Sequence, residues 1–394
     1  MKTSYQCAII GGGLSGLCLA IQLQRHGYEV VLFEKNTYPF HKVCGEYISM
    51  ESWDFLVSLN VPLPDLNLPH ISQLGVSSTS GFRLEAALPL GGFGISRYTL
   101  DAELVRIARA NGVTILEDCK VQNVSQSDNL IDKKIANNPL NYTITTAKGS
   151  FEATIVFGSY GKIPPNFMQK HQLPPEPYIG VKYHIKTDAA ANRIDLHNFK
   201  NGYCGISKVE NDTFCLCYLS TAANLKISSP TTTSNNTSTN MTTNIAKMEE
   251  KILYQNPFLK HIFTNSDFLY EKPLTISNIS FKAKQVFNNN IFTLGDAAGA
   301  IAPLCGNGMS MAMRGSKLLA QETHLFLQNR ISMSQFIANY NQKWQKAFGT
   351  RIAAGYYLQH LFGNNTTTDL ALKTLGKTPK ILQKLISLTH GQPF

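Results

Sequence analysis

The chain has 394 residues, of which 43% are hydrophobic and 16% are charged. This size and composition predict a globular α/β protein with a sizeable core, in one large domain or two intertwined ones. No apolar run is long enough to span a bilayer, which excludes a membrane-spanning helix. The first strand starts at the N-terminus, so we expect no signal peptide. Eight cysteines without a C-x-x-C pair predict free thiols in a reducing, cytoplasmic compartment.

The formal net charge of +10 is concentrated near the C-terminus. From Arg330 onward, eight basic residues face a single acid, Asp369. The favoured interpretation is a solvated helical face. The alternative is peripheral contact with the inner surface of an anionic membrane, or with an acidic partner. We expect no nucleic-acid partner.

The chain begins with a predicted strand, a glycine turn, a helix and a second strand. Gly11, Gly13 and Gly16 have the G-x-G-x-x-G spacing, the helix is predicted over 15–26, and the second strand ends at Glu34. The glycines allow a tight turn and the close approach of a pyrophosphate, which the helix N-terminus attracts. The carboxylate can accept hydrogen bonds from a ribose. The unit predicts a dinucleotide site rather than a plain glycine turn.

The central part of the chain alternates periodic segments with polar ones. Apolar residues at helical spacing predict a helix over 99–111. Cys215 and Cys217 alternate with apolar neighbours, which indicates strand positions rather than metal ligands, and we expect no metal. Predicted strands cover 113–116, 151–157, 178–185, 213–219 and 291–294, and predicted loops or joints cover 125–141, 228–243 and 364–368.

A second glycine-rich segment follows the predicted strand over 291–294. Asp296 comes directly after Gly295, where its carboxylate can bind a polyol chain. Gly306 and Gly308 precede a helix from Ser310 onward, and the N-terminus of that helix can face the electron-rich end of a flavin. The alternative is a simple Gly-Asp turn between strand and helix.

Together with Cys44-Gly45-Glu46 and Ser96-Arg97, these motifs resemble a flavoprotein superfamily. It includes p-hydroxybenzoate hydroxylase, geranylgeranyl reductases and flavin-dependent halogenases, and the geranylgeranyl reductase-like branch looks nearest. The resemblance covers most of the chain and implies FAD as the cofactor. The cofactor-binding set that it implies is Gly11, Gly13, Leu14, Ser15, Gly16, Glu34, Lys35, Cys44, Gly45, Arg97, Val121, Gly295, Asp296, Gly306, Gly308 and Met309.

One motif of these relatives is altered. Where they usually have Gly-Ala-Asp-Gly, this chain has Gly158-Ser159-Tyr160-Gly161, followed by Lys162. Tyr160 replaces an aspartate that is often tied to FAD and nicotinamide contacts. The difference puts direct use of NAD(P)H in doubt, and a separate electron-donor protein is the alternative.

The candidate catalytic residues are Cys44, Glu46 and Tyr203. Cys44 can tune the flavin, contact substrate or donate a proton weakly, or it is a small packing residue. Glu46 can move protons if it is buried, although pairing with Lys42 is the favoured interpretation. Tyr203 lies where prenyl reductases have an aromatic motif, without that motif's tryptophan and proline. His41 is interpreted as a polar loop residue.

The expected fold is a discontinuous Rossmann-like FAD domain with an inserted antiparallel β-sheet and a helical C-terminal tail. The FAD domain is assigned to 1–70, 96–175 and 273–330, the substrate sheet to 71–95 and 176–272, and the helical region to 331–394. An amphipathic helix near the C-terminus can lie on a membrane or over the active site. Aromatic residues of the sheet suit a hydrophobic substrate or form its core: Phe82, Phe93, Tyr183, Phe199, Tyr203, Phe214 and Tyr218.

Three functions are compatible with these residues. The first is reduction of C=C bonds in a lipid, prenyl, polyene or polyketide-like substrate by hydride transfer from flavin. The second is a flavin-dependent monooxygenase, either a hydroxylase or an epoxidase. The third is a FAD-carrying protein without catalysis. The Trp-x-Trp-x-Ile-Pro signature of halogenases is absent, because the two tryptophans are Trp53 and Trp344.

Overall fold

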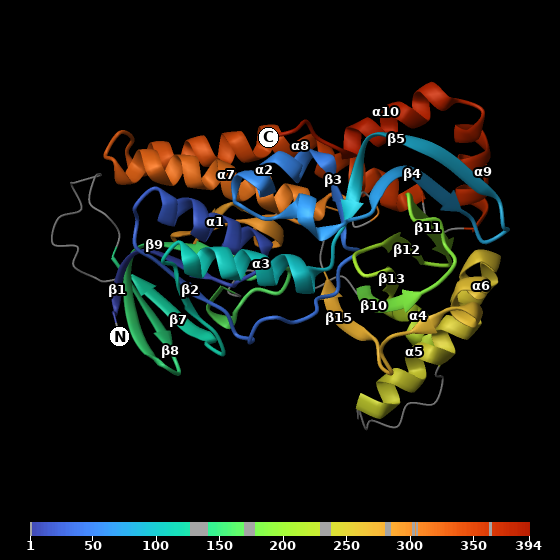
Figure 1. Cartoon of the computed structure of the whole chain (residues 1–394), viewed down its shortest axis with the longest axis horizontal. Coiled ribbons are helices and arrows are strands. Elements are labelled where there is room, and N and C mark those ends of the chain that lie inside the picture. The colour runs from blue at the N-terminus through green and yellow to red at the C-terminus, as the bar shows by residue number, and fades with distance from the viewer. Residues whose placement is uncertain are drawn as a thin grey trace.

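The computed structural model describes residues 2–126, 141–168, 178–228, 238–279, 285–301, 304, 306–361 and 365–394. Two β-sheets form the framework, each with helices packed against it (Figure 1). The chain passes between the two sheets several times, so both are built from segments far apart in sequence. The α/β architecture with a Rossmann-like unit, a second sheet and C-terminal helices confirms the predicted fold class.

The first sheet, here called the Rossmann sheet, has the strand order β16-β17-β9-β1-β2-β6. Its central strands pair in parallel and carry continuous apolar runs, as expected for strands covered on both faces. A β-hairpin made by β7 and β8 joins it through β9. The strands are β1 (Ser4–Ile10), β2 (Val30–Phe33), β6 (Thr114–Leu116), β7 (Val121–Gln126), β8 (Tyr142–Thr146), β9 (Gly149–Gly158), β16 (Phe287–Asn288) and β17 (Ile291–Thr293).

Helices cover one face of the Rossmann sheet and the hairpin lies on the other side. Leu17, Leu104, Leu319 and Trp344 come from four helices and meet in one core cluster. The helices of this layer are α1 (Leu14–Arg25), α2 (Trp53–Ser58), α3 (Arg97–Ala110), α7 (Gly308–Leu327) and α8 (Met333–Leu361), with short 3₁₀ turns at Met50–Ser52, Leu63–Leu66, Asn166–Met168 and Gly295–Ala297. None of the described helices combines the length and hydropathy needed to cross a membrane.

The second sheet, here called the inserted sheet, is mainly antiparallel, with the order β14-β10-β13-β12-β11-β4-β5-β3 and β15 beside β10. Two of its strands, β3 and β15, lie outside the ranges 71–95 and 176–272 that the sequence suggested. The strands are β3 (Tyr47–Ser49), β4 (His70–Ser77), β5 (Arg83–Gly94), β10 (Tyr178–Lys186), β11 (Arg193–Phe199), β12 (Gly202–Lys208), β13 (Phe214–Thr221), β14 (Asp267–Phe268) and β15 (Leu274–Ile279).

The two faces of the inserted sheet differ in character. Because side chains alternate along a strand, Phe214, Leu216 and Tyr218 point to one face, whereas Cys215 and Cys217 point to the other. The aromatic face packs under α5 (Ser238–Ile252) and α6 (Pro257–Asn265). The short helix α4 (Ala222–Ser228) and a 3₁₀ turn at Leu253–Gln255 complete this layer.

Most of the aromatic side chains proposed for a substrate pocket therefore belong to the sheet's own core. Tyr183, Phe199, Phe214 and Tyr218 pack in the cluster under α5 and α6. Phe93 belongs to the core of the Rossmann layer, and Phe82 is packed near the C-terminal helices. Tyr203 alone of the seven packs with residues 300 and 304.

The C-terminal helices α9 (Asn365–Gly376) and α10 (Pro379–Thr389) lie along β4 and β5 (Figure 1). Leu382 and Ile386 of α10 pack with Ile71 and Leu88 of the sheet. The apolar side of α10 is therefore engaged within the protein, although Ile381 is 54% exposed. Membrane contact through these basic helices stays a prediction.

The polar stretches differ from the expected loops. Helix α5 begins at Ser238, inside the stretch predicted as a surface insertion, and residues 229–237 lie outside the described residues. Helix α9 begins at Asn365, so the expected joint over 364–368 is wrong for its last four residues. A helix of mostly Thr and Asn at its start is stabilised by packing rather than by propensity, since Thr368 and Leu372 are buried. Most of the predicted loop over 125–141 lies outside the described residues.

Candidate functional site

The three glycines of the first motif have three different surroundings. Gly11 has a φ of +102°, and a Cβ there would lie 2.4 Å from the Ser159 carbonyl oxygen. A Cβ at Gly16 would lie 2.3 Å from the Gly11 carbonyl oxygen. At Gly13 the nearest heavy atom would be 4.0 Å away, and no side chain caps α1 at this residue. Gly11 and Gly16 therefore serve the turn and helix packing, whereas Gly13 leaves room beside a helix N-terminus that favours an anion.

Glu34 lies beside this loop. Its Oε2 accepts a hydrogen bond from the Gly12 N–H at 2.9 Å, and its Oε1 accepts from the backbone and side chain of Asn36. The carboxylate is 6% exposed and is fixed in orientation, with lone pairs left to accept hydroxyl donors. The neighbouring Lys35 is exposed, and Val121 is buried at the start of β7.

Two further segments converge on the glycine loop. The Ser15 and Ser159 hydroxyls are 2.9 Å apart, and a Cβ at Gly295 would lie 2.5 Å from Ser15 Oγ. Asp296 follows directly and forms an ion pair with Lys162 at 2.9 Å. The first motif, the altered Gly158–Lys162 segment and the Gly295-Asp296 turn therefore lie together. Leu14 and Ser15 are buried between them.

The start of α7 has buried polar atoms that could bind a polar ligand. Gly308 begins the helix, and Met309 is 8% exposed. The Oδ1 of Asn307 and the Oγ of Ser310 are buried and find no hydrogen-bond partner among the described residues. Gly306 has a φ of +62° and lies against the Tyr47 ring. A small hollow next to this helix start is lined by residues that include Asp296, Gly299, Gly308, Met311 and Trp344.

Arg97 is held by an acid of its own helix. Its Nε and Nη2 bond to the two carboxylate oxygens of Asp101 at 2.9 and 2.8 Å, and Lys42 bonds to the same carboxylate at 2.8 Å. Burial opposes the charge of Asp101, but the two cations outweigh it and hold the pKa of Asp101 below its usual value. Lys42 is therefore engaged by Asp101. The favoured pairing of Glu46 with Lys42 is wrong.

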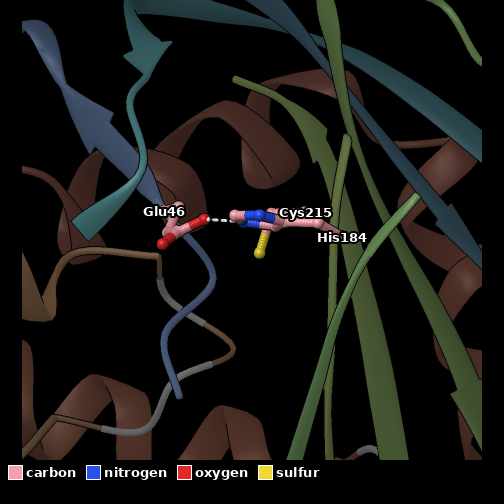
Figure 2. Close-up of side chains that lie close together, drawn as sticks. All are labelled: Glu46, His184 and Cys215. Carbon is pink, nitrogen blue, oxygen red and sulfur yellow. Dashed lines mark hydrogen bonds and ion pairs between the residues drawn. The ribbon is translucent and has the colours of Figure 1, made fainter. Parts of the chain in front are cut away.

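Glu46 instead forms the centre of a buried cluster with the inserted sheet. Its Oε1 pairs with the Lys182 ammonium and accepts the Arg97 backbone N–H at 2.7 Å. Its Oε2 bonds to His184 Nε2 at 2.6 Å, as Figure 2 shows. Burial alone would raise the pKa of Glu46, but the hydrogen bond from His184 and the charge of Lys182 hold it below the usual value. Glu46 is therefore a carboxylate within the protein.

Glu46, His184 and Cys215 lie close enough to hold a metal ion, since their ligand atoms are within 4.8 Å of one another. The Lys182 ammonium already supplies a cation at the carboxylate, and Oε2 already accepts from His184. Burial raises the pKa of Cys215 well above its usual value, which disfavours the thiolate that a metal needs. The arrangement therefore fits a hydrogen-bonded cluster better than a metal centre.

The segment before Glu46 is fastened to the inserted sheet through its backbone. The Cys215 thiol donates to the Cys44 carbonyl at 3.2 Å, and the Ser207 hydroxyl donates to the Gly45 carbonyl at 3.2 Å. The Lys182 ammonium donates to the Lys42 carbonyl at 3.2 Å. Three strands, β10, β12 and β13, thereby fix the position of this segment. The Cys44 side chain is partly buried and does not take part in these bonds.

Some functional residues are missed by the sequence motifs. Lys182 and His184 lie two apart on β10 and point to the same face, whereas Val181, Tyr183 and Ile185 point into the aromatic core. Two polar residues on one face of an otherwise apolar strand are the signal that identifies them. Tyr203 is not brought to this cluster, since it packs with Leu219, Ala300 and Leu304.

The residues present fit a flavin dinucleotide on the evidence of this structure. There is open space at Gly13, an uncapped start of α1, a fixed carboxylate at Glu34, and orphaned polar atoms at Asn307 and Ser310. An anionic pyrophosphate suits the first two features, and polar ring atoms suit the last two.

Comparison with known proteins agrees with this assignment. Residues 9–43 match the family described as NAD(P)-binding Rossmann-like domain. The chain is 25% identical over 371 residues to conditioned medium factor receptor 1 of Dictyostelium discoideum, a match that covers 88% of this chain and 69% of the relative.

Two solved structures share the fold over nearly the whole chain. The flavin-dependent brominase Bmp2 has a TM-score of 0.76 and 16% identity, covering 98% of this chain and 93% of its own. PqsL of Pseudomonas aeruginosa, described as a probable FAD-dependent monooxygenase, has a TM-score of 0.70 and 14% identity, covering 92% and 98%. The chain therefore has the fold of flavin-dependent halogenases and monooxygenases, with a Rossmann-type dinucleotide-binding unit at its start.

Proposed function

We propose that the protein is a FAD-dependent oxidoreductase. The observation that carries this proposal is that Glu34 and the Gly295-Asp296 turn both lie against the Gly11–Gly16 loop, which is open at Gly13. FAD would be held by these residues, with Val121 beside the adenine end and the Cys44–Gly45 segment near the ring. When bound, FAD supplies two-electron chemistry, either hydride transfer to a substrate or activation of dioxygen.

One face of the inserted sheet carries side chains that suit this chemistry. Hydrogen bonds from β10, β12 and β13 fix the position of the Lys42–Glu46 segment, and a rigid support of this kind suits a functional site. The same face of the sheet presents Lys182, His184 and Cys215. This face can therefore orient a polar part of a substrate and exchange protons with it, and Tyr203 with Leu219 and Leu304 offers an apolar portion.

Within this class, the favoured proposal is reduction of a C=C bond in a hydrophobic substrate. The buried Glu46–His184 pair supports it, because such a reduction needs a proton in addition to a hydride. The second candidate is a monooxygenase, which the fold similarity to PqsL favours. NAD(P)H or a separate reductase would supply the electrons in either case.

Substitution at Gly13 tests the FAD proposal. Gly13 has an extended backbone, and its Cβ position is open, so Gly13→Val should leave the free protein folded. We expect the wild-type protein to bind FAD and show flavin absorption, and the variant to lose FAD while keeping its circular dichroism spectrum. A colourless wild-type protein that refuses added FAD would overturn the proposal, as would a Gly13→Val variant that binds FAD normally.

A second measurement separates the two candidate activities. The FAD-loaded protein is reduced anaerobically and then mixed either with air or with polyene and prenyl compounds. Reoxidation by a compound under anaerobic conditions, with loss of a double bond, would support the reductase. Reoxidation only by dioxygen, with oxygen incorporated into a product, would support the monooxygenase.

A further inference from the structure

We propose that Glu46, His184, Tyr270 and His41 form a proton-transfer chain that links the buried face of the inserted sheet to solvent. The proposal rests on the proposed function, because the chain would serve flavin chemistry at that face. It deepens that function by naming the residues that bring protons to it.

The four side chains are connected without a gap. His184 Nε2 is 2.6 Å from Glu46 Oε2, and His184 Nδ1 is 2.8 Å from the Tyr270 hydroxyl. The Tyr270 hydroxyl is in turn 3.1 Å from His41 Nε2. Both ring nitrogens of His184 are therefore engaged, one toward the core and one toward the outside. A histidine bonded at both nitrogens can pass a proton across its ring.

The outer two of the four residues are more exposed than the inner two. Glu46 is fully buried and His184 is 6% exposed, whereas Tyr270 and His41 are only partly buried. The His41 ring stacks on Tyr98, which is 40% exposed. His41 is thus the entry point, and the expectation that it is merely a polar loop residue gives way to a defined contact with Tyr270.

The hydrogen-bond geometry defines a balanced transfer. Glu46 accepts the Nε2–H of His184, so His184 Nδ1 accepts from the Tyr270 hydroxyl, whose oxygen accepts from His41. A proton arriving at His41 moves to the Tyr270 oxygen, the Tyr270 proton moves to His184 Nδ1, and the Nε2 proton moves to Glu46. One proton moves inward and no bond between heavy atoms changes. Because the pKa of Glu46 is held below its usual value, Glu46 carries this proton only transiently and passes it on at the sheet face.

The groups around these four residues keep them in the protonation states that the transfer requires. Lys182 from β10 and the Arg97 backbone N–H occupy the other carboxylate oxygen of Glu46, which leaves Oε2 for His184. Burial, together with the charge of Lys182, lowers the pKa of His41, so a protonated His41 readily passes its proton on to Tyr270. Burial raises the pKa of Tyr270 to about 12, so it stays a neutral hydroxyl.

Other titratable groups face the four proton-transfer residues from neighbouring elements. They are Cys44 and Lys42 of the segment before Glu46, Cys215 of β13, Arg97 of α3, and Glu210 near His41. Burial keeps Cys215 as a neutral thiol, and Arg97 and Lys42 are paired with Asp101. These groups set the local charge and are not links in the chain.

The test follows proton uptake rather than turnover. FAD-loaded full-length protein is photoreduced anaerobically with a pH-indicator dye in weak buffer, so that flavin reduction and proton uptake are recorded together. The variant Tyr270→Phe keeps the ring and removes the hydroxyl that joins the two histidines. We expect the rate of proton uptake in this variant to fall about 100-fold or more below the wild-type rate, as is typical of lost general acid–base groups. The matched control is Tyr254→Phe, because Tyr254 packs against Phe263 and is not one of the four proton-transfer residues. Its proton uptake should match that of the wild type.

Chemical rescue provides a second measurement. His41→Ala removes the entry point at a partly exposed site, and added imidazole should restore fast proton uptake in this variant but not in Tyr270→Phe. Wild-type uptake rates in FAD-loaded Tyr270→Phe, or stoichiometric zinc in the purified protein, would overturn the proton-transfer chain. Failure of the wild-type protein to bind FAD would instead overturn the proposed function, so the two failures are distinguishable.

Discussion

Glu46 and Lys182 form an ion pair in which both side chains are completely buried. The two residues are 136 positions apart and connect the segment after β2 to the inserted sheet. Removing one partner leaves the other charge buried without compensation, which is far more costly than removing both.

We therefore expect Lys182→Met to destabilise the protein by about 3–5 kcal/mol, and the double variant Lys182→Met with Glu46→Gln to recover part of that loss. Urea unfolding followed by circular dichroism measures the free energy of unfolding. The control is Lys208→Met, because Lys208 pairs with an exposed Asp212 and should change stability by less than about 1 kcal/mol. Equal losses in Lys182→Met and Lys208→Met would contradict the buried pair.

Gly11 and Gly27 both have a positive φ and allow a second matched comparison. Gly11 has a φ of +102° and Gly27 a φ of +85°, so an alanine is strained at either position. Only Gly11 also has a backbone atom within 2.4 Å of a new Cβ, whereas Gly27 has nothing within 4 Å. Gly27→Ala should cost about 1–2 kcal/mol from backbone strain alone. Gly11→Ala should cost about 1–3 kcal/mol more, because overpacking is added. Equal melting temperatures for the two variants would contradict this account.

Sequence motifs predict the Rossmann unit well because its requirements are local. A glycine turn, a helix N-terminus and an acid at the end of the next strand lie within about 25 residues, so spacing alone identifies them. The same holds for Gly295-Asp296, which follows a short apolar strand. The alternation at Cys215 and Cys217 likewise predicts a strand, and β13 confirms it.

The partner of Glu46 is not predictable in the same way. Lys42 is the nearest basic residue in sequence, but helix α3 presents Asp101 to Lys42 and leaves Glu46 to β10. Glu46 also has a φ of +55°, a conformation uncommon for a residue other than glycine. Contacts between segments more than 100 residues apart depend on how the two sheets meet, and no local pattern encodes that arrangement.

Cys44 offers a test of catalysis that is separate from stability. Its carbonyl, not its thiol, accepts the hydrogen bond from Cys215, so Cys44→Ser preserves that contact. We expect Cys44→Ser to retain FAD and fold normally but to change the turnover rate. By contrast, Cys215→Ala removes the hydrogen-bond donor to the Cys44 carbonyl and should lower the free energy of unfolding by about 1–2 kcal/mol. Steady-state kinetics with saturating substrate check the first variant, and unchanged rates would remove Cys44 from the mechanism.

Glu249 should make stability depend on pH. It lies on the aromatic side of the inserted sheet, where the hydroxyls of Tyr183 and Tyr218 donate to its Oε1 at 2.9 and 2.7 Å. Burial raises the pKa of Glu249 from 4.5 to about 7, although the two hydrogen bonds oppose this effect. The folded protein thus binds this proton more tightly than the unfolded chain. The resulting stabilisation is complete below about pH 4.5 and is lost as the pH rises through 7.

Glu249→Gln removes this ionisation while keeping an oxygen that can accept from both tyrosines. At pH 5 the variant should be about as stable as the wild type or slightly less stable. At pH 8 the ionisation of Glu249 destabilises the folded wild type by up to about 3 kcal/mol. The free energy of unfolding of the variant should therefore rise relative to that of the wild type by a similar amount between the two pH values. The difference in unfolding free energy between the two proteins is measured by urea titration at both pH values, with exposed Glu250→Gln as the control. A difference that does not change between pH 5 and 8 would show that Glu249 ionises normally within the fold.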